Sequence, residues 1–222
     1  MEIVLASSSP RRLSLLRQIG LQCQVVVPEV DEEAILHALC PPGVTVSLDD
    51  AQRLTCRLAE AKAAAAIARL GQGQPGAEET GAHIAVAADT VVVCDGRLSN
   101  KPTDADDARQ MLAALSGKTH HVVTGLCVRR AAESLVQAEV TAVSFRDLPS
   151  ALIDTYVATG EPLDKAGGYG IQGLGGVLVR RVEGCYSNIV GLPLGRLADL
   201  LARIGVSIEQ LWALHGARPQ SG

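Results

Sequence analysis

The chain has 222 residues and a net charge of −4, and 47% of its residues are hydrophobic but only 2% are aromatic. A chain of this length is long enough to bury a substantial core, which here has to be built from Ala, Val, Leu and Ile. The negative charge and the few aromatic rings argue against a protein that binds nucleic acid. A small anionic ligand in a local basic pocket remains compatible with this balance.

The distribution of apolar residues and cysteines indicates the compartment. The first apolar run is interrupted by Arg11 and Arg12 too early for a signal peptide, and no apolar run reaches membrane-spanning length. The six cysteines form no C-x-x-C pair, which argues against a zinc site and against a disulfide framework. We therefore expect a reduced, cytoplasmic protein with no membrane partner.

The first distinctive stretch is LASSSPRR, which follows a short apolar strand near the start of the chain. Ser9 and Pro10 are typical of the N-cap and the first position of a helix. Free backbone N–H groups, the Ser7 hydroxyl and the guanidinium groups of Arg11 and Arg12 would then meet at one helix N-terminus, which favours phosphate binding. An ordinary helix cap with two solvated arginines is the alternative.

Apolar periodicity and turn residues predict the other elements in chain order. We expect strands at residues 3–5, 24–27, 84–94 with an interruption at Asp89 and Thr90, 120–130, 135–146 and 177–182. We expect helices at residues 10–19, 47–70, 104–116 after a Thr103 cap, 149–158 and 193–204, and a short last helix with Leu211 and Trp212. Residues 217–222 are expected to be disordered.

Two glycine-rich segments contain the pattern G-x-G-x-x-G, at residues 71–76 and 168–173. A dinucleotide-binding fingerprint has a strand before it and a helix after it. The first pattern follows a helix, in a predicted surface loop over residues 71–81, and the second precedes a strand, so neither indicates a nicotinamide-dependent oxidoreductase. The second segment also carries Asp164, Lys165 and Gln172, which suits either a substrate loop or a plain loop.

Two charged residues lie within segments that are otherwise apolar. Asp89 interrupts HIAVAADTVVVC, and a carboxylate buried there has to be hydrogen-bonded, paired or bound to a metal. We therefore regard Asp89 as the best candidate for chemistry, with a structural aspartate bonded to backbone N–H groups as the alternative. Lys62 lies among alanines on a predicted helix and points either inward or into solvent.

An acidic cluster and a histidine pair are further candidates for ligand binding. The cluster, which follows the second predicted strand, is either a solvated face or a source of oxygen ligands for a hard cation; it comprises Glu29, Asp31, Glu32 and Glu33. His120 and His121 are neighbours in a predicted strand, so their side chains point to opposite faces and cannot share one metal.

Several separated motifs occur in the order typical of one family: ASSSPRR, EAKA, AADTVVV, NKP, LSGKTH, EPLDKAGGYGIQGLGG and CYSNIVGLPL. On these motifs the chain resembles the Maf family of nucleoside triphosphate pyrophosphatases, and within it the YhdE-type branch that acts on dTTP and UTP. The resemblance implies an α/β fold with an elongated mixed sheet flanked by helices and two lobes around a central cleft, similar to inosine triphosphate pyrophosphatases. It also implies one Maf-like domain over residues 1–222 and a homodimer.

The resemblance assigns roles to individual positions. Asp89 matches the proton acceptor that activates water for attack on the α-phosphorus. Positions needed for activity, which we expect to bind phosphate, are matched by Ser7, Arg12, Lys62 and Lys101. Glu32 and Asp89 match the acidic residues associated with a divalent cation, Mg²⁺, Mn²⁺ or Co²⁺. Substrate choice is assigned to Arg11, Thr90 and Gln172, which match positions that distinguish this branch from the one that acts on 7-methyl-GTP. Modified pyrimidine nucleotides are further candidate substrates.

The family's association with septum formation provides an alternative, a regulatory nucleotide-binding protein that acts in the arrest of cell division. In that case the pocket binds nucleotide as a signal. The intact Asp89 favours an enzyme that clears nucleotides from the pool, because binding alone needs no carboxylate that activates water.

Overall fold

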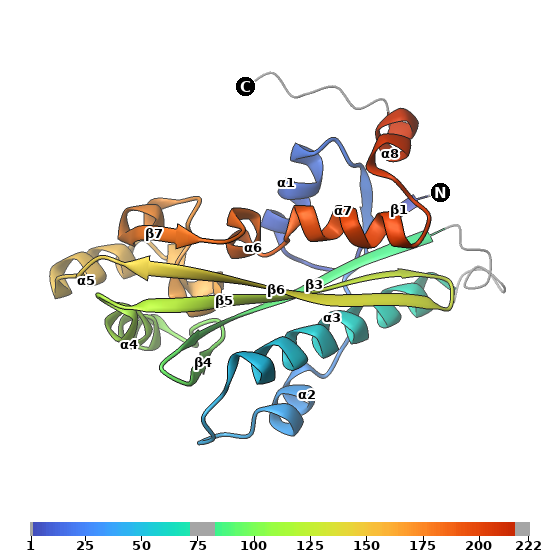
Figure 1. Ribbon diagram of the computed structural model, residues 1–222. Helices are drawn as coiled ribbons and strands as arrows, with labels where there is room; N and C mark the ends of the chain where they lie inside the picture. Colours follow the sequence, from blue (N-terminus) through green and yellow to red (C-terminus); the bar gives the residue numbers. More distant parts are fainter. Residues whose placement is uncertain (1, 72–82, 216–222) are drawn as a thin grey trace.

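The computed structural model describes residues 2–71 and 83–215 (Figure 1). The strands are β1 (Glu2–Leu5), β2 (Cys23–Val25), β3 (His83–Cys94), β4 (Arg97–Ser99), β5 (Thr119–Arg130), β6 (Glu133–Phe145) and β7 (Val179–Glu183). The α-helices are α1 (Pro10–Gln18), α2 (Glu32–Leu39), α3 (Leu48–Gly71), α4 (Ala105–Leu115), α5 (Ser150–Ala158), α6 (Tyr186–Val190), α7 (Leu194–Arg203) and α8 (Ile208–His215). Three short 3-10 helices are η1 (Glu161–Asp164), η2 (Ala166–Gly168) and η3 (Leu174–Leu178).

Two predictions concern residues that lie wholly or mainly outside these described ranges. The surface loop predicted at 71–81 lies, beyond residue 71, outside the described residues, as does the tail predicted to be disordered at 217–222. None of the described helices is both long and apolar enough to cross a membrane.

The seven strands form one mixed sheet in the order β2-β1-β3-β5-β6-β7, and β4 pairs with β3. β1 runs parallel to both β2 and β3, whereas the remaining pairs are antiparallel. The long strands β3, β5 and β6 extend through the whole molecule and connect its two ends (Figure 1). The predicted α/β fold with an elongated mixed sheet flanked by helices is therefore confirmed.

The centre of β3 lies beside a gap in the sheet. One edge of β3 pairs with β5 along most of its length, whereas the other edge pairs with β1 as far as Val86 and with β4 from Val92 onward. Within the described residues, the five positions from Ala87 to Val91 therefore have no strand partner on this second edge. Because side chains alternate along a strand, Asp89 and Thr90 in this gap project from opposite faces of the sheet.

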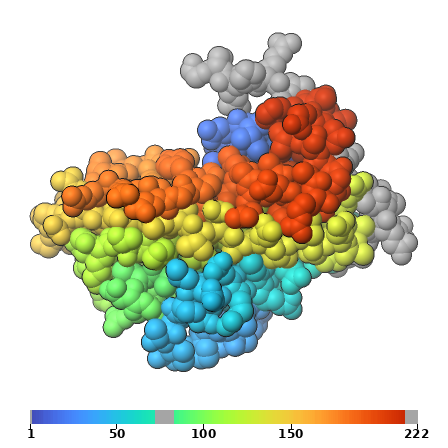
Figure 2. Space-filling view, in the orientation of Figure 1, coloured from blue at the N-terminus to red at the C-terminus, as the bar shows by residue number. Residues whose placement is uncertain are grey.

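The two faces of β3 pack against different helices. Ala87 and Val91 lie in clusters with residues of α3. On the other face, Ala88 packs in a cluster with residues of α1 and α7, and Val92 packs in a second cluster with residues of α4 and α5. Figure 2 shows the yellow and green strands between blue-to-cyan α2 and α3 and the orange-to-red segments that follow α5. The gap in the sheet thus lies between two separately packed ends.

Close packing of α3 on the sheet depends on a glycine. At its N-terminus Ser47 and Asp50 form a capping box, in which each side chain accepts a hydrogen bond from the other residue's backbone N–H. Farther along, a Cβ atom at Gly125 of β5 would overlap the backbone of Thr55 and Cys56. The absence of a side chain at Gly125 therefore allows the helix axis to approach the strand.

Two sequence predictions need correction, and several elements were not predicted. β3 is one continuous strand and is not interrupted at Asp89 and Thr90, because the gap opens on one edge only while pairing with β5 continues. The N-cap of α4 is Asp104 rather than Thr103: the Asp104 carboxylate accepts the bond from the Asp107 N–H, and Thr103 instead donates to the Asp107 carboxylate. The helices α2 and α6 and the strand β4 were not predicted.

Candidate active site

A cavity of about 740 Å³ opens at the gap beside β3, a volume within the usual range of small-molecule sites. Residues far apart in the sequence line it, from the start of α1, from α2, α3 and β3, and from the glycine-rich segment after α5. All eleven predicted site residues are among them: Ser7, Arg11, Arg12, Glu32, Lys62, Asp89, Thr90, Lys101, Asp164, Lys165 and Gln172.

The most buried ion pair of the cavity among the described residues is Lys62 with Asp89. The Nζ atom of Lys62 lies 2.6 Å from Oδ1 of Asp89 and 3.0 Å from Oε1 of Glu32, so one ammonium group joins two carboxylates. The side chains of Lys62 and Asp89 are 10% and 13% exposed, whereas Glu32, at the start of α2, is 56% exposed. Within the described part of the chain, the second oxygen of Asp89, Oδ2, accepts no hydrogen bond.

The helical repeat of α3 explains why Lys62 points inward. Leu58, Ala59, Ala63 and Ala66 are buried, and Lys62 falls within this core-facing stripe of three- and four-residue spacing. Small neighbours leave room for its long side chain to extend toward the gap. Of the two alternatives left by the sequence, Lys62 therefore points inward and not into solvent.

Arg12 lies on the opposite face of the sheet from Asp89 and connects three segments beside the gap through hydrogen bonds. Its Nε donates to the carbonyl oxygen of Gly191 (2.8 Å), and its two terminal nitrogens donate to the hydroxyls of Ser7 and Thr90 (both 3.2 Å). Burial lowers the pKa of Arg12 and the charge of Asp89 opposes this effect, but an arginine keeps its charge in proteins. Three of the five N–H donors of a guanidinium are used, which leaves two for a ligand.

Thr90 is part of the Arg12 network. Its hydroxyl lies 2.9 Å from the hydroxyl of Thr124, which in turn donates to the carbonyl oxygen of Asn188. Thr90 therefore fixes the position of the guanidinium from the face of β3 that Asp89 does not occupy. Sequence analysis missed Thr124 and Asn188, which are fully buried polar residues.

Arg11 reaches across the cavity to the glycine-rich segment. Its terminal nitrogens bind the Asp164 carboxylate (2.6 Å) and the Asp164 carbonyl oxygen (3.0 Å). Lys165 also donates to the Asp164 carboxylate (2.6 Å). Burial by itself raises the pKa of Asp164, but the bonds from Lys165 and Arg11 outweigh it, so the pKa lies below its ordinary value. The two arginines of LASSSPRR thus have separate partners.

Lys101 and Gln172 also line the cavity, and both side chains are exposed. Lys101 follows β4, whereas Gln172 lies in the glycine-rich segment between η2 and η3. His120 and His121 do not line it. As predicted, the histidines lie on opposite faces of β5: His120 is fully buried beside Tyr169, and His121 is partly exposed.

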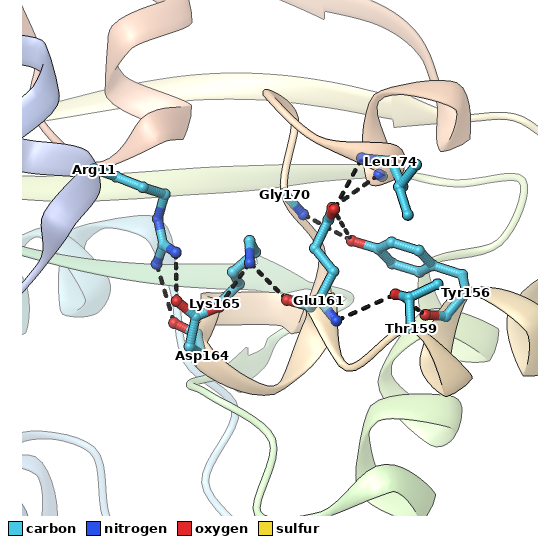
Figure 3. A network of polar contacts seen from close by, with 9 residues as sticks. Arg11, Tyr156, Thr159, Glu161, Asp164, Lys165, Gly170 and Leu174 are labelled. Atoms are coloured by element: carbon cyan, nitrogen blue, oxygen red, sulfur yellow. Dashed lines mark hydrogen bonds and ion pairs between the residues drawn. The ribbon is translucent and has the colours of Figure 1, made fainter.

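Sequence analysis also missed Glu161, the first residue of η1 (Figure 3). Its carboxylate accepts hydrogen bonds from the Tyr156 hydroxyl and from the backbone N–H groups of Leu174 and Gly175. Burial by itself raises the pKa of Glu161, but these bonds outweigh it and the pKa lies below its ordinary value. In the sequence, Glu161 looks like an acidic residue of an exposed turn before a proline. Two of its partners are backbone N–H groups, which every residue except proline has, so the sequence does not identify them.

Glu32 and Asp89 are the side chains that could hold a metal. Among the described residues, no three His, Cys, Asp or Glu side chains form a metal-binding group. Two carboxylates that contact the same ammonium nevertheless fit a hard cation that takes oxygen ligands and completes its coordination with phosphate oxygens and water. The two carboxylates are therefore compatible with Mg²⁺ or Mn²⁺, but they are too few to surround such an ion with protein ligands alone.

The cavity thus places a buried carboxylate with one unbonded oxygen among fixed cations. Residues 2–204 match the family described as Maf-like protein. The chain belongs to the Maf family. This Maf chain is 44% identical over 206 residues to a dTTP/UTP pyrophosphatase of Syntrophomonas wolfei, an alignment that covers 92% of the chain and 98% of the relative.

Two further relatives carry the same name. The dTTP/UTP pyrophosphatase of Symbiobacterium thermophilum is 45% identical over 207 residues, which are 93% of this Maf chain and 96% of the relative. That of Anaeromyxobacter dehalogenans is 46% identical over 207 residues, which are 91% of this chain and 94% of the relative. The similarity therefore extends over nearly the full length of each protein.

Proposed function

We propose that this protein hydrolyses dTTP and UTP to the nucleoside monophosphate and pyrophosphate and so removes these nucleotides, or modified pyrimidine nucleotides, from the cellular pool. The observation that carries the proposal is the contact of Lys62 with both Asp89 and Glu32 in a cavity of nucleotide size. The names of the relatives support the choice of substrate.

Asp89 is the proposed proton acceptor. Its Oδ1 atom is held by Lys62, whereas Oδ2 can accept a hydrogen bond from a water molecule. The water oxygen forms a bond to the α-phosphorus as the bond from that phosphorus to the bridging oxygen breaks. Pyrophosphate leaves with the electron pair, and the proton of the water passes to Asp89.

The cations stabilise the charge that develops on the phosphate oxygens. In phosphoryl transfer, positioning and electrostatic stabilisation provide most of the rate enhancement. Lys62 lies next to the proposed base, Arg12 has two N–H donors left for an anion, and Lys101 lines the same cavity. Lys62 and Arg12 are already held by hydrogen bonds within the protein, so little reorganisation of these two groups is needed when the triphosphate binds.

Glu32 and Asp89 are the proposed ligands of a divalent cation, Mg²⁺, Mn²⁺ or Co²⁺. When bound, such a cation supplies charge neutralisation at the triphosphate oxygens. Lys62 would then hold the two carboxylates together before the cation and the nucleotide enter.

Gln172, Arg11 and Thr90 are the proposed determinants of substrate choice. The Gln172 amide donates and accepts hydrogen bonds, which suits the edge of a uracil or thymine ring. Arg11 acts through its pairing with Asp164, and Thr90 acts through Arg12. The single domain, the homodimer and the cytoplasmic location stay predictions.

A panel of nucleoside triphosphates assayed for pyrophosphate release, with and without a chelator, tests the proposal. We expect turnover of dTTP and UTP above that of ATP, GTP and CTP, abolished by the chelator and restored by excess Mg²⁺ or Mn²⁺. Tight binding of UTP without turnover in the presence of metal would instead support the regulatory nucleotide-binding alternative.

A further inference from the structure

Glu161 is a charged residue outside the cavity lining that binds the segment carrying Gln172 (Figure 3). Its Oε1 atom lies 2.9 Å from the Tyr156 hydroxyl and 3.0 Å from the Gly175 nitrogen, and its Oε2 atom lies 2.9 Å from the Leu174 nitrogen. Every one of these partners donates. An ionised carboxylate, which only accepts, therefore matches the set.

The glycines of this segment leave room for that carboxylate. A Cβ atom at Gly173 would overlap Oε2 of Glu161, and one at Gly170 would lie 3.2 Å from Oε1 and 2.5 Å from Cε of Lys165. A Cβ atom at Gly175 would lie 2.5 Å from the Tyr156 hydroxyl. The close approach of the backbone to Glu161 and Lys165 thus explains two glycines of the second G-x-G-x-x-G pattern, Gly170 and Gly173, whereas Gly168 has a positive φ of 72°.

Gln172 lies between two anchored points of the backbone. On one side, the Gly170 nitrogen donates to the Tyr156 hydroxyl (3.0 Å), which itself donates to Glu161. On the other side, Leu174 and Gly175 donate directly to the Glu161 carboxylate. The exposed side chain of Gln172 therefore enters the cavity from a turn whose two ends are fixed by one carboxylate and its tyrosine partner.

Glu161 is also connected, through Lys165 and Asp164, to Arg11 on the opposite wall of the cavity. Lys165 donates to the backbone carbonyl oxygen of Glu161 and to the Asp164 carboxylate (both 2.6 Å). Asp164 in turn accepts the bond from Arg11. Glu161 is thereby linked to two of the three proposed determinants of substrate choice, Gln172 and Arg11, and within the described residues it contacts neither Lys62 nor Asp89.

We infer that Glu161 is a positioning residue that holds Gln172 in place for the nucleotide base and so sets the preference for pyrimidine nucleotides. The inference rests on the proposed function. It predicts that loss of the carboxylate weakens recognition of the base and leaves the chemical step intact, because the effect reaches the substrate through Gln172 and not through the phosphate-binding residues.

Glu161→Gln in the full chain tests the inference, because an amide of the same size presents N–H donors where backbone N–H groups already donate. We expect KM for UTP to rise about tenfold, as for the loss of one charge-assisted hydrogen bond, with kcat unchanged and a lower ratio of kcat/KM for UTP to that for ATP. Glu139→Gln is the matched control. Glu139 accepts two bonds from Arg196, its side chain is 23% exposed, and it lies outside the cavity lining, so KM should stay unchanged.

The double variant with Gln172→Ala separates positioning from general stability. If Glu161 acts through Gln172, adding Glu161→Gln to Gln172→Ala changes KM no further. Additive effects, or a fall in kcat at unchanged KM, would overturn the inference. Should Glu161→Gln fail to fold, Tyr156→Phe removes the bond between the hydroxyl and the carboxylate and is tested in the same way.

The proposed function is tested separately by the native chain. Absence of UTP turnover by the native protein would contradict the proposed function alone. The inference would then be tested by calorimetric titration with an α,β-imido analogue of UTP, for which we expect Glu161→Gln to raise Kd about tenfold. Equal affinity of the native protein and the variant for the analogue would overturn it.

Discussion

Lys62 and Asp89, which come from a helix and a strand separated by 27 positions, face each other at 2.6 Å beside the gap in the sheet. The same ammonium contacts Glu32 at 3.0 Å, so it offsets the repulsion between two carboxylates that would otherwise meet in a confined space. This arrangement leaves one oxygen of Asp89 available to a water molecule. A single lysine thus holds together the proposed base and the proposed metal ligands.

Asp89→Asn should abolish most of the activity. The amide retains the size of the side chain but cannot accept a proton, and loss of a general base lowers kcat by about 10²- to 10⁴-fold. Pyrophosphate release from UTP, measured at saturating substrate, checks this expectation. Undiminished activity in this variant would exclude Asp89 as the base.

Asp95→Asn is the control for that substitution. Asp95 lies in the turn after β3 and pairs with Lys118 through exposed side chains, outside the cavity lining. Its φ of 49° is a backbone conformation that asparagine tolerates. The control variant should therefore keep the native kcat, which shows that an aspartate-to-asparagine change near the same strand is harmless in itself.

Sequence reasoning identified the individual charged residues more readily than their arrangement. Asp89 and Lys62 were recognisable because each interrupts an apolar segment, where a charge needs a partner. The gap that exposes Asp89 was not predictable from local pattern, because it results from the register of β1 and β4 along one edge of β3. Only the resemblance to a family indicated that these residues meet in one cleft.

Glu161 and Gly125 show a second limit of sequence reasoning. Glu161 has backbone N–H groups as partners, and Gly125 matters because of the helix backbone that approaches it. In both cases the contact is made with backbone atoms, so the residue types at the contacted positions do not reveal it. The glycine pattern around Gly170 was visible in the sequence, but its reason required the position of the Glu161 carboxylate.

Gly125→Ala should destabilise the fold and separate Lys62 from Asp89. The new Cβ atom would overlap the backbone of Thr55 and Cys56, so α3 has to move away from β5. Overpacking of this kind costs about 1–3 kcal/mol, and the upper end applies because backbone atoms cannot rotate away. Urea unfolding measures the loss of stability, and kcat should fall in the same variant because Lys62 moves with α3.

Gly195→Ala is the matched control for Gly125→Ala. A Cβ atom at Gly195, in the first turn of α7, would meet nothing within 4 Å. Replacing a helical glycine by alanine at an open position raises stability by about 0.5–1 kcal/mol. Equal effects of the two substitutions on the free energy of unfolding would show that α3 does not depend on close approach to Gly125.

His120 should make the fold sensitive to mild acid. Its ring is fully buried, with Nε2 2.9 Å from the Tyr169 hydroxyl, and burial, followed by the charge of His121, lowers the pKa of His120 from 6.5 to about 4. As pH falls below 6.5, the unfolded chain takes up a proton at His120 that the folded chain excludes, so stability is lost from pH 6.5 down to about pH 4. From this residue alone we expect a loss of about 2 kcal/mol between pH 7 and pH 5. Urea unfolding of the native protein and of His120→Gln at both pH values measures it. The variant should lose less stability than the native protein by that amount, and parallel losses in the two proteins would contradict the assignment.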